Sequence, residues 1–131
     1  MLEKQLVDLL NDQVNMEWYS AYFYLGIYGY YTDKNLDGFA NWFHVQAQEE
    51  RDHAMLFVTY LLNNGSKLDL SDVKAASTSF ANYKEPLQAA FQRFFHRFEQ
   101  FLLDAHLLPG QAPGIALAVH ALMVAAGVFR H

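Results

Sequence analysis

Apolar residues recur at helical spacing from about Glu3 to Tyr31, and no proline interrupts them. This pattern predicts a long first helix. After the polar turn Thr32-Asp33-Lys34-Asn35, a second apolar pattern predicts a helix from Leu36 to Asn63 or Asn64, with Gly65 as a left-handed cap. Two long helices joined by so short a turn must lie antiparallel.

The second half of the chain predicts a different connection. The region from Ser66 to about Asn82 has no sustained apolar stripe, so we expect an extended crossover to the far end of the bundle. Lys84-Glu85-Pro86 is typical of a helix start, and a third helix is expected to run from there to a breaker at residues 108–114. The segment from Ile115 to Arg130 is almost wholly apolar but shorter than the roughly 18 residues of a membrane span, and predicts a short core or interface helix. The predicted fold class is all-α, an antiparallel helical bundle with a short or atypical fourth helix, in a single domain of residues 1–131.

Composition narrows the possible partners. The content of 53% hydrophobic and 16% aromatic residues indicates extensive burial, in a core or an oligomer interface. A net charge of -5 without a long basic run argues against a nucleic-acid partner. The chain has no cysteine, which excludes disulfides, thiolate metal sites and thiol nucleophiles. Because the amino terminus lacks a secretory-signal pattern, we expect a cytoplasmic protein without a membrane partner.

Two ionisable residues lie inside the apolar pattern of the second helix. Glu50 and His53 are three residues apart and therefore share one helical face. Steps of three and four residues from this pair meet a stripe that is expected to face the core: Phe39, Phe43, Gln46, Phe57, Tyr60 and Leu61. A buried carboxylate costs several kcal/mol unless it is paired, and a metal ion is a partner that also uses an imidazole.

Glu17 lies about as far before the turn as Glu50 and His53 lie after it, so an antiparallel hairpin brings the three level. Two carboxylates and an imidazole suit iron or manganese better than magnesium, and zinc would also bind. The alternative is that the three groups satisfy one another without a metal ion. Glu49 is one residue off this face, and is either a solvated or salt-bridged acid or part of a supporting iron site. Tyr24 is a core residue, a hydrogen-bond partner of a ligand or a redox residue.

Several motifs in the first 91 residues carry a family resemblance. The strongest is Gln46-Ala47-Gln48-Glu49-Glu50-Arg51-Asp52-His53-Ala54, and it is accompanied by Leu10-Asn11-Asp12-Gln13-Val14-Asn15-Met16-Glu17-Trp18-Tyr19-Ser20, by Gly38-Phe39-Ala40-Asn41-Trp42-Phe43 and by Phe80-Ala81-Asn82-Tyr83-Lys84-Glu85-Pro86-Leu87. Together they resemble the non-haem bacterial ferritins, members of the ferritin-like diiron family. In that family, helices of a four-helix bundle supply the carboxylate and histidine ligands of the metal site.

The resemblance implies a subunit of a 24-subunit homo-oligomeric cage that oxidises Fe(II) at an intra-subunit diiron ferroxidase centre and stores ferric mineral. Carried over residue by residue, Glu17 and His53 would bind the first iron and Glu50 would bridge the two irons. Glu49 would serve a neighbouring third iron site, and Tyr24 would be the tyrosine beside the centre.

The resemblance changes in two places. Arg51 stands where the haem-binding relatives have methionine, which implies that haem is absent. After Phe91 the likeness fails, because the His-Glu pair of the family's third helix falls on His96-Arg97, and an arginine cannot be the second iron's ligand. Glu99 could take that role only with a two-residue slip, and nothing acidic follows Asp104. We therefore expect a divergent tail over residues 92–131, with the second iron site in question.

The divergent tail leaves alternatives open for its origin and for the function. The tail is a natural short variant, a deliberately altered sequence or the product of a reading-frame slip near codon 92. The leading function is iron oxidation and storage, and the alternative is a non-catalytic structural or interaction subunit with an incomplete metal site. A rubrerythrin-type peroxidase is disfavoured because the chain has no cysteine to ligate its iron module.

Overall fold

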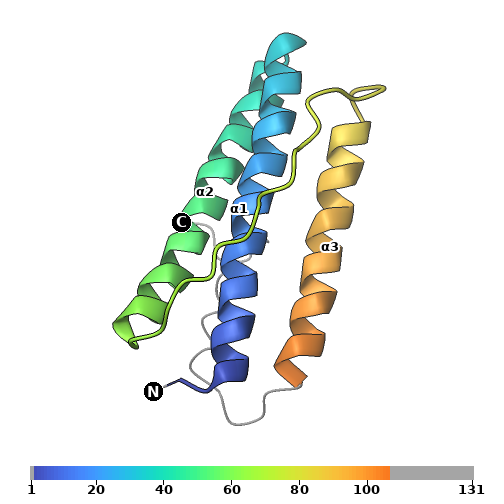
Figure 1. The fold of residues 1–131 in the computed structure, drawn as a ribbon. Coiled ribbons are helices and arrows are strands. Elements are labelled where there is room, and N and C mark those ends of the chain that lie inside the picture. The colour runs from blue at the N-terminus through green and yellow to red at the C-terminus, as the bar shows by residue number, and fades with distance from the viewer. Residues whose placement is uncertain (1, 107–131) are drawn as a thin grey trace.

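The computed structural model describes residues 2–106, and their side chains as far as residue 96; the predicted segment from Ile115 to Arg130 lies outside this part. The described chain contains the helices α1 (Lys4–Asp33), α2 (Asp37–Asn63) and α3 (Glu85–His106). α1 and α2 form an antiparallel hairpin, and α3 lies beside α1 and runs in the opposite direction (Figure 1). Within these bounds the all-α prediction is confirmed.

Each helix of the hairpin is followed by a residue in the left-handed region, Asn35 after α1 and Gly65 after α2. Asn35 has φ 60° in the turn before α2, where the backbone N–H of Leu36 donates to the carbonyl of Tyr31 at 2.9 Å. Gly65 has φ 72°, and its N–H donates to the carbonyl of Leu62 at 3.1 Å. The left-handed cap predicted at Gly65 is therefore confirmed, and it ends the helix because it satisfies carbonyls that would otherwise face water.

Two apolar clusters hold the hairpin together. The cluster remote from the turn consists of Leu6, Leu10, Val14, Phe57, Val58 and Leu61. The cluster near the turn consists of Tyr24, Ile27, Tyr30, Tyr31, Ala40 and Phe43. The predicted stripe on α2 is buried at Phe43, Phe57 and Leu61, whereas Phe39 is 49% exposed. The prediction for Phe39 is wrong because this residue, in the first turn of α2, stacks on Tyr31 at 5.3 Å with one face only and borders an open pocket with the rest of its ring.

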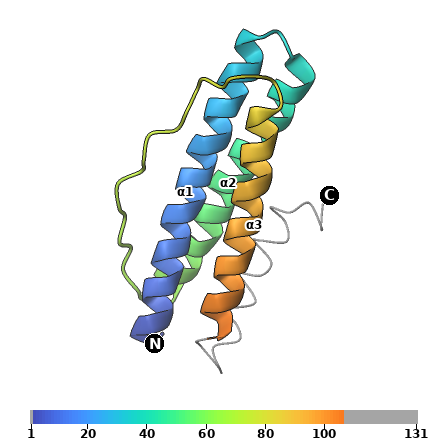
Figure 2. The ribbon, with the colours of Figure 1, turned by 90° about the vertical axis from the view of Figure 1, so that its right-hand side faces the viewer.

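The crossover between α2 and α3 runs alongside α1 (Figure 2). Two asparagines of α1 tie it to that helix. The Asn11 side chain donates to the carbonyl of Lys67 at 3.1 Å and accepts from the N–H of Asp69 at 2.8 Å. One turn later, the Asn15 side chain donates to the carbonyl of Asp69 and accepts from the N–H of Ser71, both at 3.0 Å. These amides satisfy the backbone of an extended segment that has no strand partner in the described chain.

Gly26 allows the crossover to approach α1 closely. A Cβ at this position would collide with the carbonyl oxygen of Ser77. The glycine is therefore retained for close backbone approach, at the cost of roughly 1 kcal/mol of helix propensity. Gly29, one turn further on, has no atom within 4 Å of its would-be Cβ.

α3 is attached less extensively than the hairpin helices are to each other. Asn82 caps its start by accepting the N–H groups of Lys84 and Glu85 at 3.0 Å each. The Tyr31 hydroxyl donates to the carbonyl of Tyr83 just before this cap. None of the described helices is long and apolar enough to cross a membrane.

Candidate metal centre

The two apolar clusters leave a buried polar layer between them in the middle of the hairpin. α1 contributes Glu17 to this layer, and α2 contributes Glu50 and His53, which lie one turn apart on one face. Their exposed fractions are 0%, 1% and 3%, so water does not reach them freely. The helix spacing and the short turn together explain why residues 33 positions apart meet at one level.

The three side chains offer donor atoms in a compact arrangement. One donor atom from each lies within 4.8 Å of the others. Nδ1 of His53 lies 3.3 Å from Oε2 of Glu50 and 3.7 Å from Oε2 of Glu17. Neighbouring donors around an octahedral ion with bonds of about 2.1 Å lie about 3 Å apart, so small side-chain movements would close the set around one ion. Two hard oxygen donors and one imidazole fit iron, manganese or zinc.

Charge pairing holds a proton on the imidazole when no metal ion competes for it. Burial lowers the pKa of His53, but hydrogen bonding and charge attraction from Glu17 and Glu50 outweigh it and raise that pKa to about 9. At neutral pH the imidazole of His53 in the metal-free layer is therefore protonated, beside Glu17 and Glu50. A metal ion would replace this proton as the positive charge between the carboxylates.

Gln13 supports the layer and was not predicted. Its Nε2 donates to Oε1 of Glu17 at 2.9 Å, and both residues are buried. This hydrogen bond orients the carboxylate, as outer partners of metal ligands commonly do. The signal was present in the sequence, because Gln13 lies four residues before Glu17 and such a pair shares a helical face.

The other predicted site residues have different surroundings. Tyr24 is buried in the cluster near the turn, with its ring centroid 5.9 Å from that of Phe43. Glu49 is only partly buried and is not in the group of donor atoms. Glu99 lies within the backbone range of α3, but its side chain lies outside the described residues. The described structure therefore brings together Glu17, Glu50 and His53, and the roles of the other three stay predictions.

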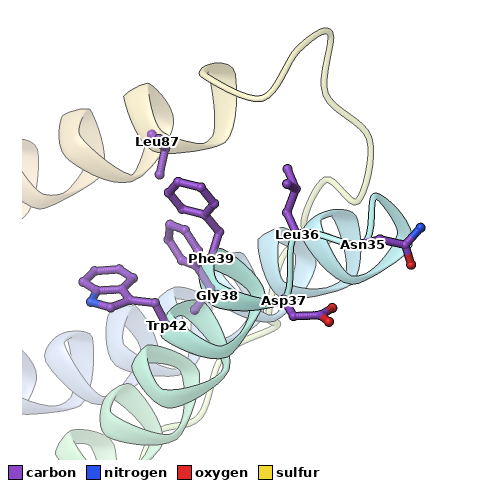
Figure 3. Close-up of a pocket in the computed structure, with 8 residues that line it drawn as sticks. Asn35, Leu36, Asp37, Gly38, Phe39, Trp42 and Leu87 are labelled. Carbon is purple, nitrogen blue, oxygen red and sulfur yellow. The ribbon is translucent and has the colours of Figure 1, made fainter.

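A separate apolar pocket of about 700 Å³ opens at the end of the hairpin (Figure 3). Phe39 and Trp42 of α2 face Leu87 of α3 across it, and Asp37 is its one acidic lining residue. None of the three clustered ionisable residues lines this pocket. Its lining suits an apolar contact and offers no set of metal ligands.

Comparison with known sequences identifies the family. The family model described as a ferritin-like domain matches residues 7–101. A bacterial non-heme ferritin of Staphylococcus saprophyticus is 35% identical over 101 residues, which is 75% of this chain and 60% of that protein. The bacterial non-heme ferritin of Campylobacter jejuni is 33% identical over 102 residues, covering 78% of this chain and 58% of its own. This chain thus spans about 60% of the length of the curated relatives it matches.

Solved structures show the same fold. A humanized archaeal ferritin superposes with a TM-score of 0.82 at 24% identity, covering 98% of this chain and 84% of that one. An open pore ferritin from Archaeoglobus fulgidus gives a TM-score of 0.81 at 23% identity, covering 98% and 85%. With the family model matching more than half of its residues, the chain belongs to the ferritin-like domain family.

Proposed function

We propose that this chain is an iron-storage subunit that binds Fe(II) at Glu17, Glu50 and His53 and promotes its oxidation. The observation that carries the proposal is the buried group of three donor atoms within 4.8 Å of one another. Outside metal sites, placing two carboxylates and a histidine in an apolar layer is costly, since each charge loses hydration. A bound cation would offset this cost by pairing with the carboxylates.

Each residue of the layer would have a separate role in holding iron. Glu17 and Glu50 would hold iron as Fe(II) and as Fe(III), because carboxylate oxygens accept both. His53 would supply a nitrogen donor after losing its proton, and Gln13 would keep the Glu17 carboxylate in place. Each Fe(II) gives one electron, so two Fe(II) ions, oxidised together or in turn, supply the two electrons that convert O₂ and two protons to hydrogen peroxide.

Storage in a cage and a cytoplasmic location are part of the same proposal. They are supported by family membership and by the bacterial non-heme ferritins that the chain resembles. The three donor residues lie within one chain, so the proposed binding of Fe(II) needs no residue of a partner subunit.

Anaerobic addition of Fe(II) followed by air tests the proposal. The intact chain should develop the near-ultraviolet absorbance of Fe(III) faster than buffer does. The double variant Glu50→Gln, His53→Ala should lose this phase, because two of the three donors are gone. The matched control Asp52→Asn, His44→Ala makes the same changes on α2 outside the donor group and should retain it. Equal rates in the two double variants would refute the proposal.

A structural or interaction subunit without ferroxidase activity is the second candidate. It is favoured by the third helix, where the residue that contacts α1 beside the layer is Arg93. Such a subunit would keep the fold and fail the oxidation assay. Light scattering of the intact chain would then show that it assembles, although the oxidation assay shows no iron turnover.

A further inference from the structure

We infer that the buried layer holds one metal ion per chain, where a ferritin-type diiron centre would hold two. The inference rests on the proposed function, because it takes Glu17, Glu50 and His53 to be metal ligands. It is carried by the position of α3, and in particular by the side chain of Arg93.

Arg93 fixes which part of α3 lies level with the layer. Its guanidinium donates to Oγ of Ser20, from Nη2 at 2.8 Å and from Nε at 3.2 Å. Nη2 also lies 3.4 Å from the carbonyl oxygen of Met16, and the guanidinium carbon lies 4.3 Å from the centre of the Tyr19 ring. Met16 and Ser20 bracket Glu17 on α1. Arg93 is therefore level with the Glu17 carboxylate, on the flank of α1 that faces α3.

Ser20 links the arginine to the layer. It is fully buried, and its hydroxyl donates to the carbonyl of Met16 at 3.0 Å while it accepts from Arg93. On a helix Ser20 lies about 60° around the axis from Glu17 and one turn along it. These contacts hold the positive charge of Arg93 next to the layer, and a shift of α3 along α1 would break them.

A second ion would need further hard oxygen donors, and α3 offers none at this level. Within one turn on either side of Arg93, α3 runs from Ala89 to Arg97 and contains no acidic residue. Glu99 is six residues beyond Arg93, which is about 9 Å along the axis. Glu85 is eight residues before it, and its carboxylate accepts the N–H of Ala81 at the start of the helix.

The described residues add no further ligand cluster to compensate. Among the described residues, the only group of three ligand-type side chains close enough to hold an ion is Glu17, Glu50 and His53. The sequence contains no Asp or Glu after Asp104. A guanidinium beside the layer also repels a second cation, since like charges in a partly buried site interact strongly. One ion with three protein ligands and open positions is the arrangement these residues support.

Metal stoichiometry tests the inference without any turnover. Equilibrium dialysis of the full chain against Co(II) should give one tight equivalent per chain, and this equivalent should be absent from Glu50→Gln, His53→Ala. Two tight equivalents that are both lost in the double variant would overturn the inference and leave the proposed function standing. If the double variant binds as many tight equivalents of Co(II) as the parent chain, the proposed function fails.

Electron paramagnetic resonance of the Co(II) chain gives an independent reading. For a single ion, the signal per bound Co(II) should stay constant as loading rises to one equivalent. A pair of ions bridged by Glu50 would couple magnetically, so a fall in signal per ion at full loading would overturn the inference.

Variants of Arg93 test its electrostatic part. Arg93→Gln removes the charge and should tighten Co(II) binding on the order of threefold at low ionic strength, with a smaller gain in high salt. Arg93→Lys retains the charge and should bind as the parent does. Unchanged or weaker binding by the folded glutamine variant, as judged by its circular dichroism, would show that Arg93 does not repel cations at this site.

Discussion

The α1–α2 hairpin and α3 differ in how they are packed and in what they present. The hairpin buries two continuous apolar clusters and encloses two carboxylates and a histidine between them. α3 leaves Phe91 64% exposed and meets α1 through a few contacts, of which the charged one is Arg93. The comparison shows that the candidate metal ligands lie in the part of the molecule that buries the two apolar clusters.

This difference has a physical basis. Three buried ionisable groups can be kept at fixed distances only if the helices that carry them are held rigidly. Apolar clusters on both sides of the layer supply that rigidity within the hairpin. We therefore expect the hairpin to control stability and metal binding, and α3 to modulate them.

The largest effect should come from emptying the hairpin core. Phe57 is fully buried, and Phe57→Ala should lower the free energy of unfolding by about 3–5 kcal/mol, through lost burial and the cavity that remains. The matched change in α3, Phe91→Ala, should cost roughly 1 kcal/mol or less because that ring is largely exposed. Chemical denaturation measures both. Equal losses would contradict the division between the two regions.

Metal binding should depend on pH through His53, whose pKa is raised to about 9. Below that pH the ion must displace a proton, so Zn(II) affinity should rise about tenfold per pH unit, with one proton released per ion. In the metal-free chain, the stabilisation from charged His53 is fully present below its ordinary pKa of 6.5 and is lost as pH rises through 9. Titration calorimetry in buffers of different ionisation enthalpy counts the protons. An affinity that is flat from pH 6 to 8 would rule out this pairing.

Two glycine variants test whether the stability of the hairpin depends on the crossover that lies along α1. Gly26→Ala places a methyl group against the Ser77 carbonyl and should destabilise the fold by about 1–3 kcal/mol, despite the better helix propensity of alanine. Gly29→Ala meets no atom and should stabilise by up to about 1 kcal/mol. Thermal unfolding of the pair would decide, and a stabilised Gly26 variant would mean that the crossover does not approach α1 at this point.

A smaller effect is expected where the crossover is held by a side chain. Asn11→Ala removes two hydrogen bonds to the backbone of residues 67 and 69 and should cost about 1–2 kcal/mol. Amide hydrogen exchange at Asp69 should speed up, because its N–H loses its acceptor. Unchanged exchange would show that this segment is held by other contacts.

Helix spacing and the short turn made much of the hairpin predictable. The first helix was expected from Glu3 to Tyr31 and spans Lys4–Asp33; the second was expected from Leu36 and spans Asp37–Asn63. The meeting of Glu17 with Glu50 and His53 followed from counting residues on either side of the turn. Their role as metal ligands stays a proposal.

Other features could not be read from local patterns. The bond from Asn11 to Lys67 joins residues 56 positions apart, and no periodicity encodes such a pair. The need for glycine at position 26 has no local signal either, because the approaching Ser77 carbonyl belongs to a distant segment without a pattern of its own. The position of Arg93 along α1 depends on where the crossover places the start of α3, and this is set by tertiary contacts.

The central claim is that the hairpin itself forms the metal centre. Anomalous X-ray diffraction from crystals of the full chain grown with Zn(II) tests it most directly. The account predicts one strong peak per chain, about 2.0–2.2 Å from carboxylate oxygens of Glu17 and Glu50 and from the imidazole of His53. Zinc peaks found only at other residues, with these three side chains left uncoordinated, would contradict it.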